Sequence, residues 1–340
     1  MSERMPEQTT EQATEQSAAA LETPAVKRNR KRGKHESKAH IRSPKMWPTW
    51  CLVGLAWVIA RLPLSWIFGL GRGVGWLLYR LGGSRRRVTL KNLTACFPEM
   101  TPSQRDKLAK QVFQNVSMGA LELMIPWLNP KRSLAHHFDV VGLRHLQDAV
   151  AQGRGVVLIG AHFAVMDVIS QPLSDCGPID VMYRFNKNPV WEWLQVSGRQ
   201  RYFDGVIERE NTRQVLKSLR QGRVIWYAPD QDYGPRHSVF APFFGVPAAT
   251  ITATSRFARL NDSPVLTLQV SRNARQRSWQ LEFGPPIQGF PSGDEVVDAT
   301  TINQHIEAMI IKDPSQYLWL HKRFKTRPVG APKFYSRSTS

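Results

Sequence analysis

The sequence places a histidine and a carboxylate five residues apart, His162 and Asp167, directly after the apolar run VVLIGA. This spacing does not put two side chains on one helix face, where neighbours are three or four residues apart, so we expect the pair to meet across a strand-to-helix turn. A carboxylate there fixes the tautomer of the imidazole and stabilises its charged form. His162 is then a general base for a hydroxyl group; the alternative is a histidine that lies in a turn by chance.

The run VVLIGA predicts a buried strand of a parallel sheet, because it is continuously apolar. Ligands of open α/β sheets bind beyond the carboxyl ends of the strands, and His162 stands at that position. Two other predicted strands also end in polar residues, since IDVMY precedes Arg184 and VIWYAP precedes Asp230 and Asp232. We expect these side chains to face one cleft. The alternative is a solvated arginine and two turn aspartates, because PDQDYGP is rich in turn formers.

The elements that position these residues follow a regular order. From Phe138 onward, short apolar runs alternate with helical stretches, which predicts an α/β fold with a mostly parallel central sheet flanked by helices. The later runs PVLTLQVSR and SWQLEFGPPI are closely spaced, and we expect them to add antiparallel strands. Thr101 and Pro102 predict the start of a long helix, and a last helix is expected from about Glu295 to Lys312.

Charge marks off the N-terminal part of the chain. Residues 1–26 carry five glutamates and one arginine, and residues 27–45 carry nine Lys or Arg and one glutamate. Few large apolar groups accompany them, so we expect a disordered arm over 1–45, acidic first and then basic. The whole chain has a formal charge of +19, and +15 of it remains from Met46 onward. A basic folded part favours anionic partners.

The next segment, 46–82, holds five of the eleven tryptophans and almost no acidic residue. Apolar residues flanked by Trp, Lys and Arg are typical of a membrane belt, so we expect a membrane-associated helical segment here. Its longest uncharged run ends at Ala60 and is shorter than the roughly 20 residues that a spanning helix needs. Arg61 and Pro63 then interrupt it. Two arrangements follow: a single span that tolerates Arg61, or an anchor that lies in the membrane interface.

Cysteine and serine patterns narrow the chemistry further. Cys51, Cys96 and Cys176 are widely spaced and form no CxxC pair or Cys/His cluster, so we expect neither a disulfide framework nor a metal site. A reducing, cytoplasmic setting is the simplest assignment. The sequence has no Gly-x-Ser-x-Gly elbow, the motif that presents the serine nucleophile of α/β-hydrolases.

The candidate residues lie within longer blocks that carry a family resemblance. These blocks are FPEM at 97–100, GAHFAVMD at 160–167, YRFNKNP at 183–189, WLQVSGRQR at 193–201, VIWYAPDQDYGPRHSVFAPFFG at 224–245 and QYLWLHKRFKTRP at 316–328. Through them the chain, from about Met46 to Pro328, resembles the late acyltransferases of bacterial lipid A biosynthesis, the lauroyl/myristoyl transferase family. That family belongs to the lysophospholipid acyltransferase superfamily, which is defined by His-x4-Asp/Glu.

The resemblance implies an inner-membrane enzyme of a Gram-negative bacterium, with its catalytic domain on the cytoplasmic face. Such an enzyme moves a fatty acyl chain, lauroyl-type in our interpretation, from acyl carrier protein to a hydroxyl of an anionic, Kdo-bearing lipid A precursor, without a further cofactor. By the resemblance, His162 matches the family's base, Asp167 its partner, and Arg199 a position assigned to the active site. Further candidates for binding the substrate are Arg184, Arg201, Asp230 and Asp232.

The expected organisation has four parts: the arm over 1–45, a membrane anchor over 46–82, an acyltransferase α/β domain over 83–328 and a flexible tail over 329–340. Within the same class, the alternatives are myristoyl or palmitoleoyl transfer to the other lipid A position, or a glycerolipid acyltransferase. A non-catalytic basic module at a membrane or a nucleic acid is the alternative of another class. It does not explain the polar strand ends, so no nucleic-acid partner is expected.

Overall fold

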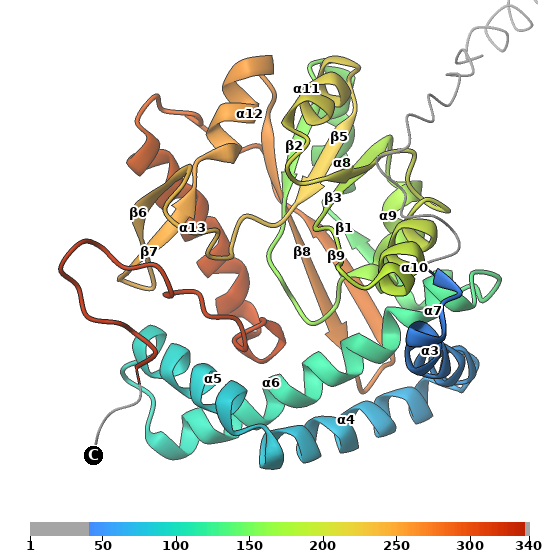
Figure 1. The fold of residues 1–340 in the computed structure, drawn as a ribbon. Helices are drawn as coiled ribbons and strands as arrows, with labels where there is room; N and C mark the ends of the chain where they lie inside the picture. The colour runs from blue at the N-terminus through green and yellow to red at the C-terminus, as the bar shows by residue number, and fades with distance from the viewer. Residues whose placement is uncertain (1–40, 337–340) are drawn as a thin grey trace, which may run out of the picture. The chain divides into compact units, whose positions relative to one another are not determined.

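The structure, a computed structural model, describes residues 41–336. Its centre is a seven-stranded sheet in the order β1-β9-β8-β2-β5-β3-β4 (Figure 1). The strands are β1 (Phe138–Val141), β2 (Val156–Ile159), β3 (Ile179–Tyr183), β4 (Val206–Glu208), β5 (Val224–Tyr227), β8 (Val265–Asn273) and β9 (Ser278–Phe283). Strands β8, β2, β5, β3 and β4 are parallel, whereas β9 is antiparallel to β8 and parallel to β1. The predicted mostly parallel sheet is confirmed, and so is the antiparallel pairing of the two late strands.

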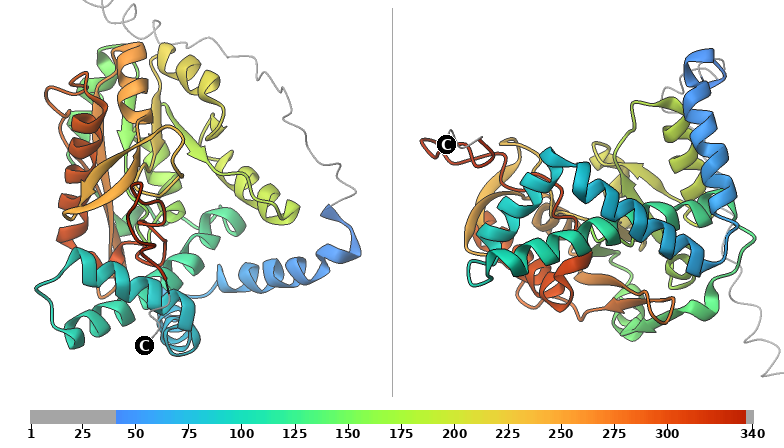
Figure 2. Two further views of the ribbon diagram at one scale, coloured as in Figure 1. Left: turned by 60° about the vertical axis from the view of Figure 1, so that its left-hand side comes forward. Right: turned by 90° about the horizontal axis from the view of Figure 1, so that it is seen from below.

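Helices connect the strands and cover the sheet (Figures 1 and 2). They are α8 (Leu143–Ala151), α9 (Ser170–Asp175), α10 (Pro189–Arg199), α11 (Thr212–Arg220), α12 (Ala253–Asn261) and α13 (Glu295–Lys312). The central strand β2 is buried on both faces, because Val157 and Ile159 belong to one hydrophobic cluster and Val156 and Leu158 to another. Its continuous apolar run is the sequence signature of this double burial.

One element is not predicted from the sequence. An antiparallel hairpin, β6 (Ser238–Phe243) and β7 (Val246–Ile251), packs beside α13. Pro242 and Pro247 lie opposite each other in it. Proline within an apolar run argues against a strand, and a two-stranded hairpin tolerates it because each strand has a free edge.

In the described part of the chain, α-helices that precede the sheet are α3 (Trp47–Ile59), α4 (Leu64–Leu81), α5 (Gly83–Cys96), α6 (Pro102–Glu122) and α7 (Met124–Leu128). Helix α6 begins with a capping box between Thr101 and Gln104, which confirms the predicted start. Figure 2 shows α4, α5 and α6 side by side below the sheet. Helices α4 and α6 approach closely, because a Cβ atom on Gly75 would lie 2.4 Å from the Cα atom of Gln114.

The apolar segment 46–82 forms two helices instead of one. Helix α3 has 13 residues, and the 18 residues of α4 include Arg72 and Arg80. Over residues 41–336, none of the helices combines the length and the apolarity that a membrane crossing requires. The choice between a single span and an interfacial anchor stays a prediction. Both helices expose large apolar side chains: Trp47, Leu52, Leu55, Trp57, Val58, Trp66, Leu70, Val74, Trp76, Leu77, Leu78 and Leu81.

The two ends of the chain are described only in part. Of the arm predicted over 1–45, residues 1–40 lie outside the described residues, and so do residues 337–340 of the predicted tail. Within residues 329–336, two side chains of the predicted tail pack against the domain, although Val329 is fully exposed. Phe334 and Tyr335 contact a core cluster, and the Tyr335 hydroxyl donates a hydrogen bond of 2.6 Å to Asn92 Oδ1. Two adjacent aromatic side chains with a buried polar partner account for this order.

Candidate active site

His162 lies in the loop that follows β2, at the carboxyl end of the parallel sheet. A distant segment holds this loop, because Leu318 N–H donates to His162 O at 2.9 Å and Ala164 N–H donates to Gln316 O at 2.6 Å. Gln316 is fixed in turn by β8, where its side-chain amide exchanges hydrogen bonds of 2.8 and 3.0 Å with the backbone of Arg272. The position of the histidine therefore depends on three parts of the chain that are far apart in sequence.

The partner of the His162 ring is Asp230. Its Oδ1 atom lies 2.6 Å from His162 Nδ1, and its Oδ2 atom accepts a hydrogen bond of 3.0 Å from the His162 backbone N–H. Asp230 follows β5, which is the neighbour of β2 in the sheet. An ionised carboxylate only accepts hydrogen bonds, so Nδ1 carries the proton and the lone pair of the neutral ring is on Nε2. His162 is 21% exposed, which leaves its ring accessible to a substrate.

The electrostatics of Asp230 fit this role. Its side chain is 1% exposed. Burial on its own raises the pKa of Asp230, but the charge and hydrogen bonds of His162, with a contribution from the Tyr317 hydroxyl, outweigh it and lower the pKa to about 2. The carboxylate is therefore ionised throughout the neutral range and stabilises a positive charge on the ring. A histidine with this support can accept the proton of a hydroxyl group.

Asp167 occupies a different place from the one predicted. It begins a short 3-10 turn (Asp167–Ile169), and both of its oxygens bind Arg199, at 2.6 Å from Nε and 3.0 Å from Nη2. The two side chains are only 11% and 8% exposed, so each neutralises the other in a poorly solvated setting. The prediction that Asp167 orients the ring of His162 is therefore corrected: Arg199 engages both oxygens of Asp167, and Asp230 binds the ring.

The other predicted residues divide between the site and the framework. Arg184 lies close enough to lower the pKa of Tyr233, although burial and the charge of Asp230 prevail and raise it to about 12. Arg201 donates to the Trp127 carbonyl, at the junction of α10 and α7. Asp232 accepts hydrogen bonds of 2.6 and 2.8 Å from the N–H and hydroxyl of Thr326. The structure thus gives Arg201 and Asp232 intramolecular contacts, and the predicted substrate contacts of the candidates stay predictions.

Three residues beside the site were not singled out from the sequence: Tyr317, His321 and Arg323. His321 Nε2 accepts a hydrogen bond of 3.3 Å from Asp232 N–H, and burial lowers its pKa to about 4. Arg323 is 2% exposed and donates to the carbonyl of Ala249 at 2.6 Å. These residues belong to the block QYLWLHKRFKTRP at 316–328, which carries the family resemblance and is rich in cations, but the guanidinium of Arg323 is buried. The presence of this block was the sequence signal for these three residues, but the sequence does not distinguish buried from exposed cations.

No three side chains of His, Cys, Asp or Glu converge as metal ligands between residues 41 and 336. The arrangement as a whole offers an ionised carboxylate, Asp230, and the imidazole of His162 that it supports, at one sheet edge. These groups can activate a hydroxyl group for attack on an electrophilic carbon.

Comparisons with known proteins agree on one family. The family model described as bacterial lipid A biosynthesis acyltransferase matches residues 34–326. The lipid A biosynthesis lauroyltransferase of Escherichia coli is 38% identical over 86% of this chain and 96% of its own length. The palmitoleoyltransferase of the same organism is 36% identical over 86% and 95%, and its myristoyltransferase is 27% identical over 87% and 93%.

Proposed function

Because the chain belongs to the bacterial lipid A biosynthesis acyltransferase family, we propose that it transfers a lauroyl-type fatty acyl chain from acyl carrier protein to a hydroxyl of a Kdo-bearing lipid A precursor. Family membership makes the protein an acyltransferase of lipid A biosynthesis. Lauroyl transfer is the finer part of the proposal. It is supported by the 38% identity to the lauroyltransferase, against 36% and 27% for the palmitoleoyl- and myristoyltransferases.

The observation that carries the proposed mechanism is the contact between His162 and buried Asp230. The acceptor hydroxyl gives its proton to His162 Nε2 as its oxygen attacks the thioester carbonyl carbon of the donor. The tetrahedral intermediate then collapses, the ester forms, and the C–S bond breaks. The leaving sulfur takes the proton from the imidazolium, which restores the neutral ring. Asp230 holds the ring in the required tautomer and stabilises its charge during this cycle.

The Asp167–Arg199 pair has a supporting role in this proposal. Asp167 begins the turn that follows the His162 loop, and Arg199 is the last residue of α10, so the ion pair ties this turn to the end of α10. Arg199 uses two of its five N–H groups, one on Nε and one on Nη2, for Asp167, so the two on Nη1 and the second on Nη2 remain for a phosphate or an oxyanion. The predicted contact of Arg199 with the substrate is compatible with this arrangement.

For location, we propose attachment to the cytoplasmic face of a bacterial inner membrane through α3 and α4. The exposed tryptophans support an interfacial position: Trp47, Trp57, Trp66 and Trp76 are 64%, 48%, 67% and 50% exposed. Indole rings favour the boundary between hydrocarbon and water. Arg61 and Arg80 lie over the rings of Trp57 and Trp76, so cations and aromatic groups occupy the same surface. A surface of this composition also suits an acceptor that is itself a membrane lipid.

The experiment is an acyl-transfer assay on the purified full chain. The donors, tested in parallel, are acyl carrier protein loaded with a lauroyl, a myristoyl or a palmitoleoyl chain. The acceptor is a Kdo-bearing lipid A precursor or lysophosphatidate. We expect lauroyl transfer to the sugar lipid, and the His162→Ala variant should lose about 10²–10⁴-fold in turnover because it lacks the base. Acylation of lysophosphatidate alone would refute the acceptor, and a preference for another chain would refute the lauroyl assignment. Full activity of His162→Ala would refute the mechanism.

A further inference from the structure

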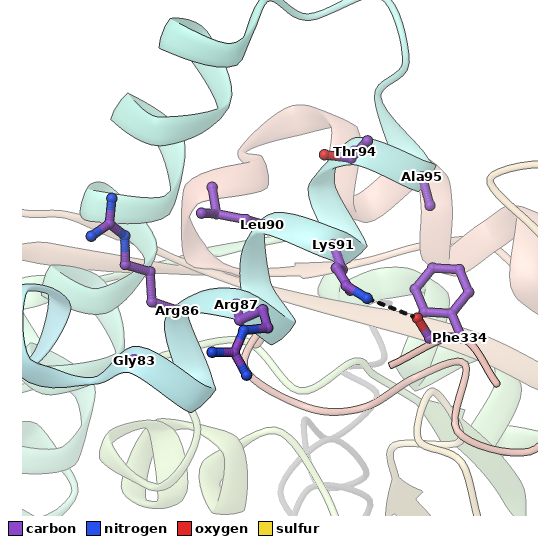
Figure 3. A pocket seen from close by; sticks show the side chains of 8 residues that line it. All are labelled: Gly83, Arg86, Arg87, Leu90, Lys91, Thr94, Ala95 and Phe334. Atoms are coloured by element: carbon purple, nitrogen blue, oxygen red, sulfur yellow. Dashed lines mark hydrogen bonds between the residues drawn. The ribbon is translucent and has the colours of Figure 1, made fainter. Parts of the chain in front are cut away.

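Helix α5 carries a groove on its outer face that the acyl-transfer chemistry does not use (Figure 3). The groove encloses about 670 Å³. It is lined by Gly83, Arg86, Arg87, Leu90, Lys91, Thr94, Ala95 and Phe334. The opposite face of the helix carries Asn92, which donates hydrogen bonds of 2.8 Å to the carbonyls of Trp319 and His321. The groove and the active-site segment therefore lie on different sides of α5.

The polar side of the groove is cationic, and no carboxylate is among its lining residues. Arg86 contacts Asp106 at 3.3 Å, outside the lining. Lys91 Nζ donates to the carbonyls of Phe334 and Ser336, at 3.4 and 2.7 Å. Arg87 is exposed and forms no ion pair with a residue in the described part of the chain. At least one guanidinium is thus free for an anion, and two further cations flank it.

The apolar side is built by two distant segments. Leu90 and Ala95 come from α5, whereas Phe334 comes from the C-terminal segment. Figure 3 shows Lys91 reaching to the backbone of Phe334, whose ring lies beside the helix. The next residue, Tyr335, anchors that segment through its hydrogen bond to Asn92. The groove is therefore a composed feature of the fold, with a cationic rim and an apolar wall. Such a combination fits an anionic amphiphile.

Its place in the chain indicates which amphiphile. The groove begins at Gly83, two residues after Leu81, the last residue of α4, which is 73% exposed. It therefore adjoins the C-terminal end of α4, where the apolar side chain of Leu81 is exposed. We propose that the α5 groove binds the phosphate head group of an anionic phospholipid of the bilayer, with Arg87 as the main phosphate contact and Phe334 against the acyl portion. This inference rests on the proposed membrane attachment, and it concerns a lipid other than the reacting acceptor.

The test is native mass spectrometry of the full chain in detergent with added phosphatidylglycerol or phosphatidylcholine. We expect a retained phosphatidylglycerol adduct, weakened about tenfold by Arg87→Gln, because a charge-assisted contact to phosphate is lost. Ala95→Phe fills the groove while every cation stays in place, and it should also weaken the adduct. The matched control is Arg72→Gln, which removes an exposed arginine of α4 that does not line the groove.

Each result decides the matter. Equal weakening by Arg72→Gln and Arg87→Gln would mean general attraction to a basic surface and would overturn the site, as would equal retention of both lipids. Displacement of the adduct by millimolar inorganic phosphate would assign the groove to a free anion and overturn the lipid. If Arg87→Gln instead raises KM for the acyl donor while the adduct persists, the groove docks an acidic protein. His162→Ala should keep the adduct, so failure of the acyl-transfer mechanism is detected separately.

Discussion

At the scale of single residues, two aspartates exchange the roles that their positions in the sequence suggest. Asp167 stands in the motif with His162, yet it binds Arg199 with both oxygens. Asp230 is 68 residues away from His162 in the chain and contacts its ring. A carboxylate selects its partner by distance and burial, so spacing along the chain does not decide which one supports the base.

Replacing Asp230 and Asp167 one at a time tests this assignment. Asp230→Asn should lower kcat by about two to four orders of magnitude, because the amide favours the wrong tautomer of His162 and does not stabilise the imidazolium. Asp167→Asn leaves Arg199 buried and unpaired, so it should cost about 3 kcal/mol of folding free energy. Its kcat at saturating substrate, measured below the lowered unfolding temperature, should fall less. The opposite order of kcat values would return the orienting role to Asp167.

The pH dependence of stability should report His321. Its pKa is about 4 in the folded protein, below the ordinary 6.5, so protonation favours the unfolded chain. The stabilising contribution of neutral His321 is complete above pH 6.5 and is lost as the pH falls from 6.5 towards 4. The contribution of Asp230, whose pKa is lowered from 3.8 to about 2, is lost only below pH 3.8.

The measurement is the urea midpoint at pH 7 and pH 4.5, for the unmodified chain and for His321→Asn. We expect the midpoint of the unmodified chain to fall between the two pH values more than that of the variant. Parallel declines would show that His321 is not the group responsible.

At the scale of elements, α6 approaches the loop after β2 so closely at Gly119 that a side chain has no room there. A Cβ atom on Gly119 would lie 1.7 Å from the carbonyl oxygen of Ala164, so the helix backbone touches the loop directly. Glycine is required here for space, since its backbone is helical. The long helix thus sets the position of the loop that carries His162.

Gly119→Ala should therefore displace that loop. We expect the overlap to cost about 1–3 kcal/mol of folding free energy. We also expect kcat to fall when it is measured at a temperature where the variant is still folded, because the loop that carries His162 has moved. Gly73→Ala is the matched control, because a Cβ atom there meets nothing within 4 Å on the exposed side of α4. It should leave activity unchanged and raise stability slightly through helix propensity. An active Gly119→Ala protein would show that the loop position is not critical.

At the scale of the whole molecule, the catalytic edge of the sheet and the apolar surface of α3 and α4 belong to one compact unit within the described residues 41–336. Helix α4 packs along α6, and α6 contacts the loop of His162. The proposed membrane surface is therefore connected to the site through packed helices. A lipid acceptor held at the bilayer can meet the base without a separate linker.

Vesicle flotation tests that surface. The double variant Leu70→Ser/Leu77→Ser removes two side chains that are 43% and 48% exposed on α4. We expect it to bind neutral phosphatidylcholine vesicles about tenfold or more weakly, because it forfeits apolar burial in the interface. Ile311→Ser, at a 61% exposed position of α13, should bind as the unmodified chain does. Equal binding by all three proteins would show that α4 does not face the bilayer.

The sequence by itself determined the local features of this protein. The unbroken apolar run before His162 specified a strand buried on both faces, and therefore the position of the histidine at the carboxyl end of a parallel sheet. Thr101 and Pro102 specified a helix start, and alternating runs specified the α/β class. The spacing of apolar residues, the helix caps and the continuous apolar runs each involve only a few neighbouring residues, so they can be recognised in the sequence.

The tertiary structure alone decided which groups meet. The pairing of β2 with β5 brings Asp230 to His162, and the end of α10 brings Arg199 to Asp167. The same folding buries Arg323 although the preceding residue, Lys322, is an exposed cation. These outcomes depend on strand order and on the free energy of placing each charge out of water, and both are properties of the whole packed chain.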